Sequence, residues 1–199
     1  MADVFRIHLG NTPLSDDERQ ALIPSLATQR ELNEFEYENI LSARRWALHP
    51  RRLAKAEVLN ASYLLDLHKR MFNATWRWAG RFRTTPRTIG VEPHRIAPDL
   101  AALLGDAQYW IDHRVHPADE IALRFHHRLV FIHPFANGNG RHARLAADIL
   151  ALKLGQPAFP WGAKTGEPSV IRQDYLEALR QADNQDFAAL FRFARSGKL

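Results

Sequence analysis

Helical periodicity runs through most of this chain and constrains its fold more than any other feature. Two segments begin with a capping box, in which a hydroxyl residue precedes an acid by three positions: Ser15 with Glu18, and Thr28 with Glu31. A proline soon ends the first segment, whereas the second continues with apolar residues at helical spacing as far as Pro50. The sequence therefore predicts a short helix followed by a long one.

Further segments each carry one apolar stripe at a helical period. The expected helices cover 58–72, 98–111, 117–132, 141–155, 169–181 and 186–195. Residues 78–96 lack this period and are rich in Gly, Pro and β-branched residues, which predicts a loop with a short β-hairpin near 87–97. The expected fold class is all-α with one hairpin, in a single domain over residues 1–199.

Composition excludes several classes of protein. The 199 residues contain no cysteine, which rules out a thiolate metal site, a Cys nucleophile and a disulfide framework. The longest apolar runs, such as 187–191, fall far short of the ~20 residues that cross a bilayer, so no membrane partner is expected. The N-terminus shows no secretory signal, and a cytoplasmic location is expected. The net charge of +5 favours an anionic partner.

The most informative segment lies between two expected helices, over residues 133–144. His133 precedes a proline and should end one helix, and Arg141 should begin the next. Between them, Gly138-Asn139-Gly140 can adopt left-handed conformations that point successive backbone N–H groups at an anion. Arg144 shares a helix face with Arg141, so both guanidinium groups can flank that anion. These residues predict a phosphate-sized site with a histidine at its rim.

These residues also carry a resemblance to a known family. The sequence HPFANGNGRHAR (133–144) resembles the signature of Fic-domain proteins, H-P-F-x-[D/E]-G-N-G-R-x-x-R, and departs from it only at Asn137. The segment AGRFR (79–83) resembles the family's conserved stretch before its flap. Together with TQRELNEFEYEN (28–39), nearly the whole chain resembles the small bacterial Fic subgroup called mobile mystery protein B.

The resemblance implies a fold, a reaction and roles for individual residues. Fic proteins are helical bundles with a flap, and they typically transfer AMP from ATP to a Tyr, Ser or Thr hydroxyl of a target protein. His133 matches the catalytic base and Phe135 the buried anchor of the loop. The residues that match the phosphate-binding positions are Gly138, Asn139, Gly140, Arg141 and Arg144. Asn137 stands where an acid usually binds Mg²⁺, and its neutral amide predicts a weaker metal site.

Two further expectations concern docking and regulation. The flap, near 87–97, implies a target-docking edge that includes Thr88, Ile89, Gly90 and Val91, to which a target segment can add as a strand. Many Fic proteins carry an inhibitory glutamate that pairs with the second motif arginine. The nearest match is Glu31 in the N-terminal region 1–50, which would pair with Arg144, although Glu31 is equally explained as part of a capping box.

The residues leave alternatives open. The chain could be a degenerate Fic fold that acts as a non-catalytic binding module beside a DNA-binding or other protein. It could also transfer UMP or another group, because the predicted anion site binds phosphate and does not recognise the base. A metal hydrolase is disfavoured, since neighbouring His126 and His127 point to different helix sides and no acid completes a ligand set. Such a toxin-like protein could also bind an antitoxin or another regulatory partner, and it could form a homodimer.

Overall fold

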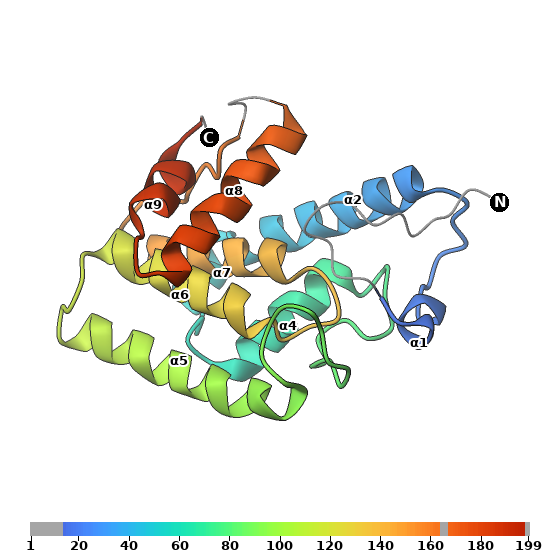
Figure 1. Cartoon of the computed structure of the whole chain (residues 1–199), viewed down its shortest axis with the longest axis horizontal. Helices are drawn as coiled ribbons and strands as arrows, with labels where there is room; N and C mark the ends of the chain where they lie inside the picture. The colour runs from blue at the N-terminus through green and yellow to red at the C-terminus, as the bar shows by residue number, and fades with distance from the viewer. Residues whose placement is uncertain (1–13, 164–166, 198–199) are drawn as a thin grey trace.

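The computed structural model describes residues 14–163 and 167–197, and the chain is mostly helical in these ranges (Figure 1). The described helices are α1 (Asp16–Gln20), α2 (Gln29–Ala47), α3 (Pro50–Ala54), α4 (Ala61–Phe72), the 3-10 helix η1 (Pro93–Arg95), α5 (Ile96–Asp112), α6 (Ala118–Ile132), α7 (Asn139–Lys153), α8 (Pro168–Asp183) and α9 (Ala188–Arg195). The all-α class predicted from periodicity is confirmed. The sequence analysis did not anticipate α3 or η1.

The helix starts follow the capping chemistry of the sequence. Both predicted capping boxes are present, with the backbone N–H of Glu18 donating to Ser15 Oγ at 3.3 Å and that of Glu31 to Thr28 Oγ1 at 3.2 Å. The helix expected from residue 58 begins three residues later, because Asn60 caps it through its side-chain oxygen.

Helix α7 lies at the centre of the bundle and is buried along most of its length. Small side chains make this possible, because a helix rich in alanine lets its neighbours approach closely; the buried alanines of α7 are Ala143, Ala146, Ala147 and Ala151. Helix α6 packs along α7, and α3 and α4 also contact it. In Figure 1, α5 and the α8–α9 pair lie on opposite sides of α6 and α7. The first turn of α7 is therefore held rigidly from several directions.

The predicted β-hairpin near 87–97 is wrong. The structure has no strand there; residues 84–92, called the flap loop below, are irregular, and η1 and α5 follow. Pro86 and Pro93 have no N–H to donate to a strand ladder, and Gly90 has a left-handed φ of +94°. The guanidinium of Arg83 donates to the carbonyls of Thr85, at 2.9 Å, and Val91. A side chain thus satisfies the carbonyl groups that a second strand would otherwise pair.

The segment that contains α1 is joined to the core by its backbone. Ile23 N–H donates to the carbonyl of Thr75 at 2.8 Å, and Arg77 N–H donates to that of Ala21 at 2.9 Å. Residues 1–13, on which the expectation about a secretory signal depends, lie outside the described ranges.

None of the helices within residues 14–163 and 167–197 is both long enough and apolar enough to cross a membrane.

Candidate active site

His133 lies at the point where α6 gives way to the loop. It caps the C-terminus of α6 with left-handed angles (φ 55°, ψ 59°), which are uncommon for a residue other than glycine. Its backbone N–H still donates to the carbonyl of Leu129 at 3.3 Å, and Pro134 prevents the helix from continuing. The residue is 8% exposed, so its ring is held in a nearly closed environment.

The environment of His133 keeps its imidazole neutral. Burial, followed by the positive charges of Arg83 and Arg87, lowers the pKa of His133 to about 4, against a smaller opposite effect of a backbone hydrogen bond with Val130. A ring N–H that donates to that carbonyl leaves the second ring nitrogen as the basic atom. At neutral pH, His133 can therefore accept a proton.

Two buried side chains brace the loop after His133. The side-chain amide of Asn139 accepts from the N–H of Phe135 at 2.9 Å and donates to its carbonyl at 2.8 Å. The Phe135 ring is 1% exposed and stacks on His68, with ring centroids 3.6 Å apart. In this structure the side chain of Asn139 holds the loop closed, and only its backbone N–H belongs to the helix start that the sequence predicts to bind an anion.

The predicted anion site consists of the N-terminus of α7 and one left-handed residue, Gly138, that precedes it. Gly138 has φ +79°, and a Cβ there would lie 2.4 Å from the ring of Phe72, so only glycine fits. Asn139 and Gly140 form the first turn of α7 and not a run of left-handed residues as expected. The early N–H groups of a helix have no intrahelical acceptor and favour negative charge. The predicted anion site thus depends on α7 itself.

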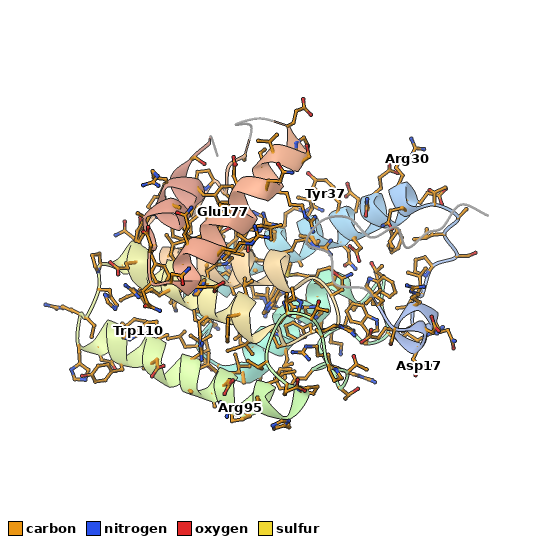
Figure 2. All side chains as sticks on the ribbon, viewed as in Figure 1. Asp17, Arg30, Tyr37, Arg95, Trp110 and Glu177 are labelled. Carbon is orange, nitrogen blue, oxygen red and sulfur yellow. The ribbon has the colours of Figure 1, made fainter. Side chains whose placement is uncertain are left out.

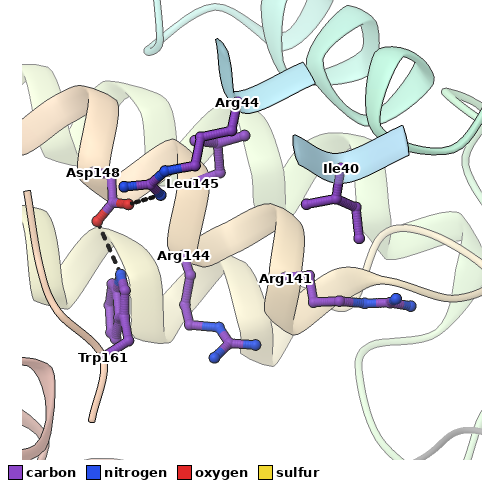
Figure 3. A pocket seen from close by; sticks show the side chains of 7 residues that line it. All are labelled: Ile40, Arg44, Arg141, Arg144, Leu145, Asp148 and Trp161. Carbon is purple, nitrogen blue, oxygen red and sulfur yellow. Dashed lines mark hydrogen bonds and ion pairs between the residues drawn. The ribbon is translucent and has the colours of Figure 1, made fainter. Parts of the chain in front are cut away.

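Arg141 and Arg144 project from α7, on the side that faces α2 and residue 161 (Figure 3). Arg141 donates to the carboxylate of Glu36 at 2.5 Å, and the other oxygen of Glu36 accepts from Trp76 Nε1 at 2.7 Å. Arg144 lies over the ring of Tyr175, with its Cζ 5.3 Å from the centroid. A cavity of about 190 Å³ lies beside the two arginines. The cavity lining is Ile40, Arg44, Arg141, Arg144, Leu145, Asp148 and Trp161.

Asn137 is a poor candidate for holding a metal. Its Oδ1 accepts from the N–H of Gly138 at 2.5 Å and from Arg141 at 3.4 Å, so the amide oxygen faces a guanidinium. Across residues 14–163 and 167–197, no cluster of three His or acidic side chains could hold an ion. The residues present do not fit a metal held by the protein alone, because Mg²⁺ prefers several hard, mostly anionic oxygens.

The flap loop covers His133. A Cβ at Gly90 would lie 2.5 Å from the Cβ of His133, so glycine permits the close approach. Val91 N–H donates to the carbonyl of Ile132 at 3.3 Å, and Arg83 Nε donates to that of His133 at 2.7 Å. Three of the four predicted docking residues, Thr88, Ile89 and Gly90, are exposed and Val91 is partly buried beside the loop.

The structure places Glu31 away from this arrangement, at the first turn of α2. Its carboxylate accepts from the N–H groups of Ala27 at 2.8 Å and Thr28 at 3.1 Å, which holds the pKa of Glu31 below its usual range. The acid of α2 that reaches a motif arginine is Glu36, which pairs with Arg141 and not with Arg144.

Sequence reasoning missed two of the residues at the site, Glu36 and His68. His68 is fully buried; its Nδ1 accepts from the N–H of Gly80 at 2.9 Å, and its Nε2 lies 3.1 Å from the carbonyl of Asn137. It thereby links the AGRFR segment to the loop, two stretches that the sequence singled out separately. Nothing in the local sequence distinguishes Glu36 from the three other acids between 31 and 38.

The part of the chain that contains this site is similar to known proteins. Residues 58–151 match the model of the Fic/DOC family. The chain is 30% identical over 150 residues to a protein adenylyltransferase Fic of Nematostella vectensis, covering 71% of this chain and 33% of that relative. It is 31% identical over 135 residues to the protein of that name in Drosophila grimshawi, covering 65% and 26%. The chain therefore spans about a third or less of the length of these curated relatives.

Solved structures share the fold. The BepC protein of Bartonella tribocorum with bound AMPPNP superposes with a TM-score of 0.68 at 18% identity, covering 93% of this chain and all of that one. Fic-1 of C. elegans (residues 134–508 in its own numbering) superposes with a TM-score of 0.64 at 24% identity, covering 89% and 51%.

Proposed function

This chain belongs to the Fic/DOC family, and we propose that it is a protein adenylyltransferase that transfers AMP from ATP to a Tyr, Ser or Thr hydroxyl of a target protein. The observation that carries the proposal is a buried, neutral His133, which a short loop braced by Asn139 connects to the N-terminus of α7 and its two arginines. The relatives named adenylyltransferases support the type of reaction.

The chemistry assigns one task to each part of the site. The basic nitrogen of His133 removes the proton from the target hydroxyl as its oxygen bonds to the α-phosphorus. The bond from the α-phosphorus to the bridging oxygen breaks, and pyrophosphate leaves with its electron pair. The first-turn N–H groups of α7 face the phosphates, while Arg141 and Arg144 hold the β- and γ-phosphates. Positioning and charge stabilisation dominate this kind of transfer.

Magnesium enters the proposal only with the nucleotide. Because Asn137 supplies a neutral oxygen that already accepts two hydrogen bonds, we expect phosphate oxygens and water to hold Mg²⁺, with little help from the chain. None of the steps above depends on a metal ligand from the protein.

Regulation is proposed to come from α2, within a single domain over 1–199. The residue that would restrain the site is Glu36 and not Glu31, because Glu36 is 5% exposed and occupies Arg141, one of the two donors proposed for the phosphates. A carboxylate and a phosphate compete for the same guanidinium donors. Binding of an antitoxin or of a second copy of the chain, either of which would change this restraint, stays a prediction. The cytoplasmic location stays a prediction as well.

Labelled-nucleotide transfer tests the proposal. Wild-type protein, incubated with Mg²⁺, a bacterial lysate and ATP labelled on its α-phosphate, is expected to label one or more proteins. His133→Ala should reduce labelling about 10²–10⁴-fold, since it removes the general base. It should still bind ATP, because the arginines and the α7 N-terminus are untouched. The exposed His113, at the C-terminus of α5, supplies the matched control His113→Ala.

Undiminished labelling by His133→Ala would contradict the mechanism. Label from UTP in place of ATP would keep the mechanism and change the nucleotide. No labelling by wild-type protein, together with steeply salt-dependent binding to nucleic acid, would favour a non-catalytic binding module.

A further inference from the structure

The segment that should dock a target has no backbone hydrogen bonds of its own. Within the described part of the chain, the N–H and carbonyl groups of Thr88, Ile89 and Gly90 bond to no other backbone group. This leaves them free to pair with an added strand, and it also leaves the segment dependent on its flanks for a fixed position. What anchors the flanks therefore decides where a target hydroxyl comes to lie.

The flank after the segment is anchored on the C-terminal end of α6 and on Arg83. Val91 bonds to Ile132 through its N–H and to the guanidinium of Arg83 through its carbonyl. This anchor consists of residues inside the region that matches the family model.

The flank before the segment is anchored on α1, outside that region. The guanidinium of Arg87 pairs with the carboxylate of Glu18, and Thr85 Oγ1 donates to the same carboxylate at 3.1 Å. The side chains of Arg87 and Glu18 are only 7% and 13% exposed, so water screens the pair little. The hydrogen bonds to Arg87 and Ser15 hold the pKa of Glu18 below its usual range against the effect of burial.

Helix α1 is a firm support for this contact. Trp78 Nε1 donates to the backbone carbonyl of Glu18 at 3.2 Å, and Glu18 also accepts from the N–H of Ser15 at 2.8 Å in the capping box. Since the backbone of residues 21–23 is bonded to residues 75–77, α1 and the flap loop are tied to one rigid frame.

We propose that Glu18 is a positioning residue for target docking. Through Arg87 and Thr85, it holds the flap loop in the position from which a docked hydroxyl reaches His133. The proposal rests on the proposed function and adds to it a contribution from outside the region that matches the family model. Loss of the Glu18 charge leaves Arg87 buried without its counter-ion, and the flap loop then samples positions in which a docked hydroxyl misses His133. Target docking should weaken while nucleotide binding, which uses other groups, stays the same.

The test uses one variant on each side of the contact. Glu18→Gln removes the charge and keeps the capping box, because glutamine serves in that position as well. Arg87→Met removes the donors from the flap side and keeps an unbranched side chain that matches the arginine as far as Nε. Asp17→Asn is the matched control: Asp17 lies on α1 and is exposed at the edge of the molecule (Figure 2).

Three measurements are made on the full chain. Hydrogen exchange of the Val91 amide, the one in this segment that is hydrogen-bonded, should quicken about tenfold or more in Glu18→Gln and Arg87→Met, as expected for loss of a charged hydrogen bond. The apparent KM for lysate protein, labelled from α-labelled ATP, should rise by a similar factor. The Kd for a non-hydrolysable ATP analogue should stay within about twofold. The double variant should add nothing beyond either single one.

Exchange at the wild-type rate in both variants overturns the proposal, and so does faster exchange with an unchanged KM for lysate protein. An equal effect of Asp17→Asn also overturns it, because the effect would then belong to α1 in general. If wild-type protein labels nothing, the proposed function fails, whereas the exchange measurement still shows whether Glu18 anchors the flap loop.

Discussion

At the scale of single residues, the proposed chemistry depends on a histidine that is kept neutral by its surroundings. His133 is buried under Gly90 and lies near the charges of Arg83 and Arg87, and both conditions disfavour its protonated form. The same guanidinium of Arg83 that lowers this pKa also bonds to the His133 carbonyl and to the flap loop. One side chain therefore adds to the effect of burial on the pKa of His133 and also holds the segment above it in position.

Asn137 supplies the prediction that belongs to this scale. Asn137→Asp places a carboxylate beside the phosphate site, where a hard anionic oxygen raises affinity for Mg²⁺. We expect the Mg²⁺ concentration for half-maximal transfer to fall several-fold, on the order of 1 kcal/mol in binding free energy. A magnesium titration of wild type and variant at fixed ATP measures this shift.

The contact between Asn137 and Arg141 indicates which outcome would contradict this prediction. Because Asn137 Oδ1 lies 3.4 Å from Arg141, the new carboxylate could pair with that guanidinium instead of with a cation. An unchanged or increased requirement for Mg²⁺ would show that it does. Asp66, half-buried on α4 and paired with Arg70, provides the control Asp66→Asn, for which no shift is expected.

The residues of the loop could be predicted because they are neighbours in the sequence. His133, Gly138, Arg141 and Arg144 lie within twelve positions, and a helix stop followed by a helix start brings them together without any knowledge of the rest of the chain. Glu36 could not be predicted in the same way. Its contact with Arg141 joins residues 105 positions apart, and it depends on how α2 is rotated on the bundle.

At the scale of elements, the rotation of α2 decides which acid faces the site. Glu31 is occupied by backbone N–H groups at the helix start, whereas Glu36 lies more than one turn later and points at Arg141. Between the same two helices, Arg44 of α2 bonds to the buried Asp148 of α7 at 2.7 Å, which fixes the rotation from the other end (Figure 3).

This geometry predicts different effects for two acids on one helix. Glu36→Gln keeps an acceptor for Trp76 and releases Arg141 for the phosphates, so transfer should quicken about tenfold. Glu31→Gly should lower the melting temperature, because its hydrogen bonds to the N–H groups of Ala27 and Thr28 are lost, and leave the rate unchanged. Initial rates of labelling and melting temperatures are measured on the same preparations.

The exposed Glu38 of α2 provides the control Glu38→Gln, which should change neither quantity. A slower Glu36→Gln enzyme would show that Glu36 orients Arg141 productively. A gain in rate with Glu31→Gly alone would return the inhibitory role to the residue that sequence reasoning preferred.

Most elements could be predicted from periodicity, and the flap could not. The apolar stripes of α2, α6 and α7 follow the helical period, so their existence is determined locally. The flap loop has β-branched residues and a glycine typical of a hairpin, but its carbonyl groups find their donors on Arg83. A single buried arginine can thus replace a strand ladder, and residue types alone do not reveal it.

At the scale of the whole molecule, the bundle buries an unusual amount of imidazole around the site. His68, His126 and His142 are 0% exposed, and His133 is nearly so. Phe135 lies between two of them, stacked on His68 and edge-on to His142 at 5.0 Å. The loop after His133 is therefore supported by groups that ionise readily in water but are neutral in the folded chain.

The energetic consequence is a pH-dependent stability. Burial lowers the pKa of His142 to about 4 and that of His126 to about 3, and it lowers the pKa of His68 well below its usual range. In the unfolded chain these histidines bind protons near pH 6.5. Between that pH and their folded pKa values the unfolded state holds more protons, so the free energy of unfolding decreases as the pH falls, and it is undiminished above about pH 6.5.

We therefore predict that this protein loses stability between about pH 6.5 and pH 5, with a slope that approaches about 1.4 kcal/mol per pH unit for each such histidine at the lower end of this range. Burial raises the pKa of Asp148 and works in the opposite direction, so a difference between variants is the sharper measurement. His142→Gln keeps a donor for the carbonyl of Leu64, which His142 Nε2 approaches at 3.0 Å, and should reduce the slope by one histidine's share. Urea denaturation across this pH range measures the slope.

The exposed His94 gives the control His94→Gln, whose slope should equal that of wild type. If His142→Gln also keeps the wild-type slope, the folded chain admits a proton at His142, and the loop above it is more open than the packing of Phe135 indicates.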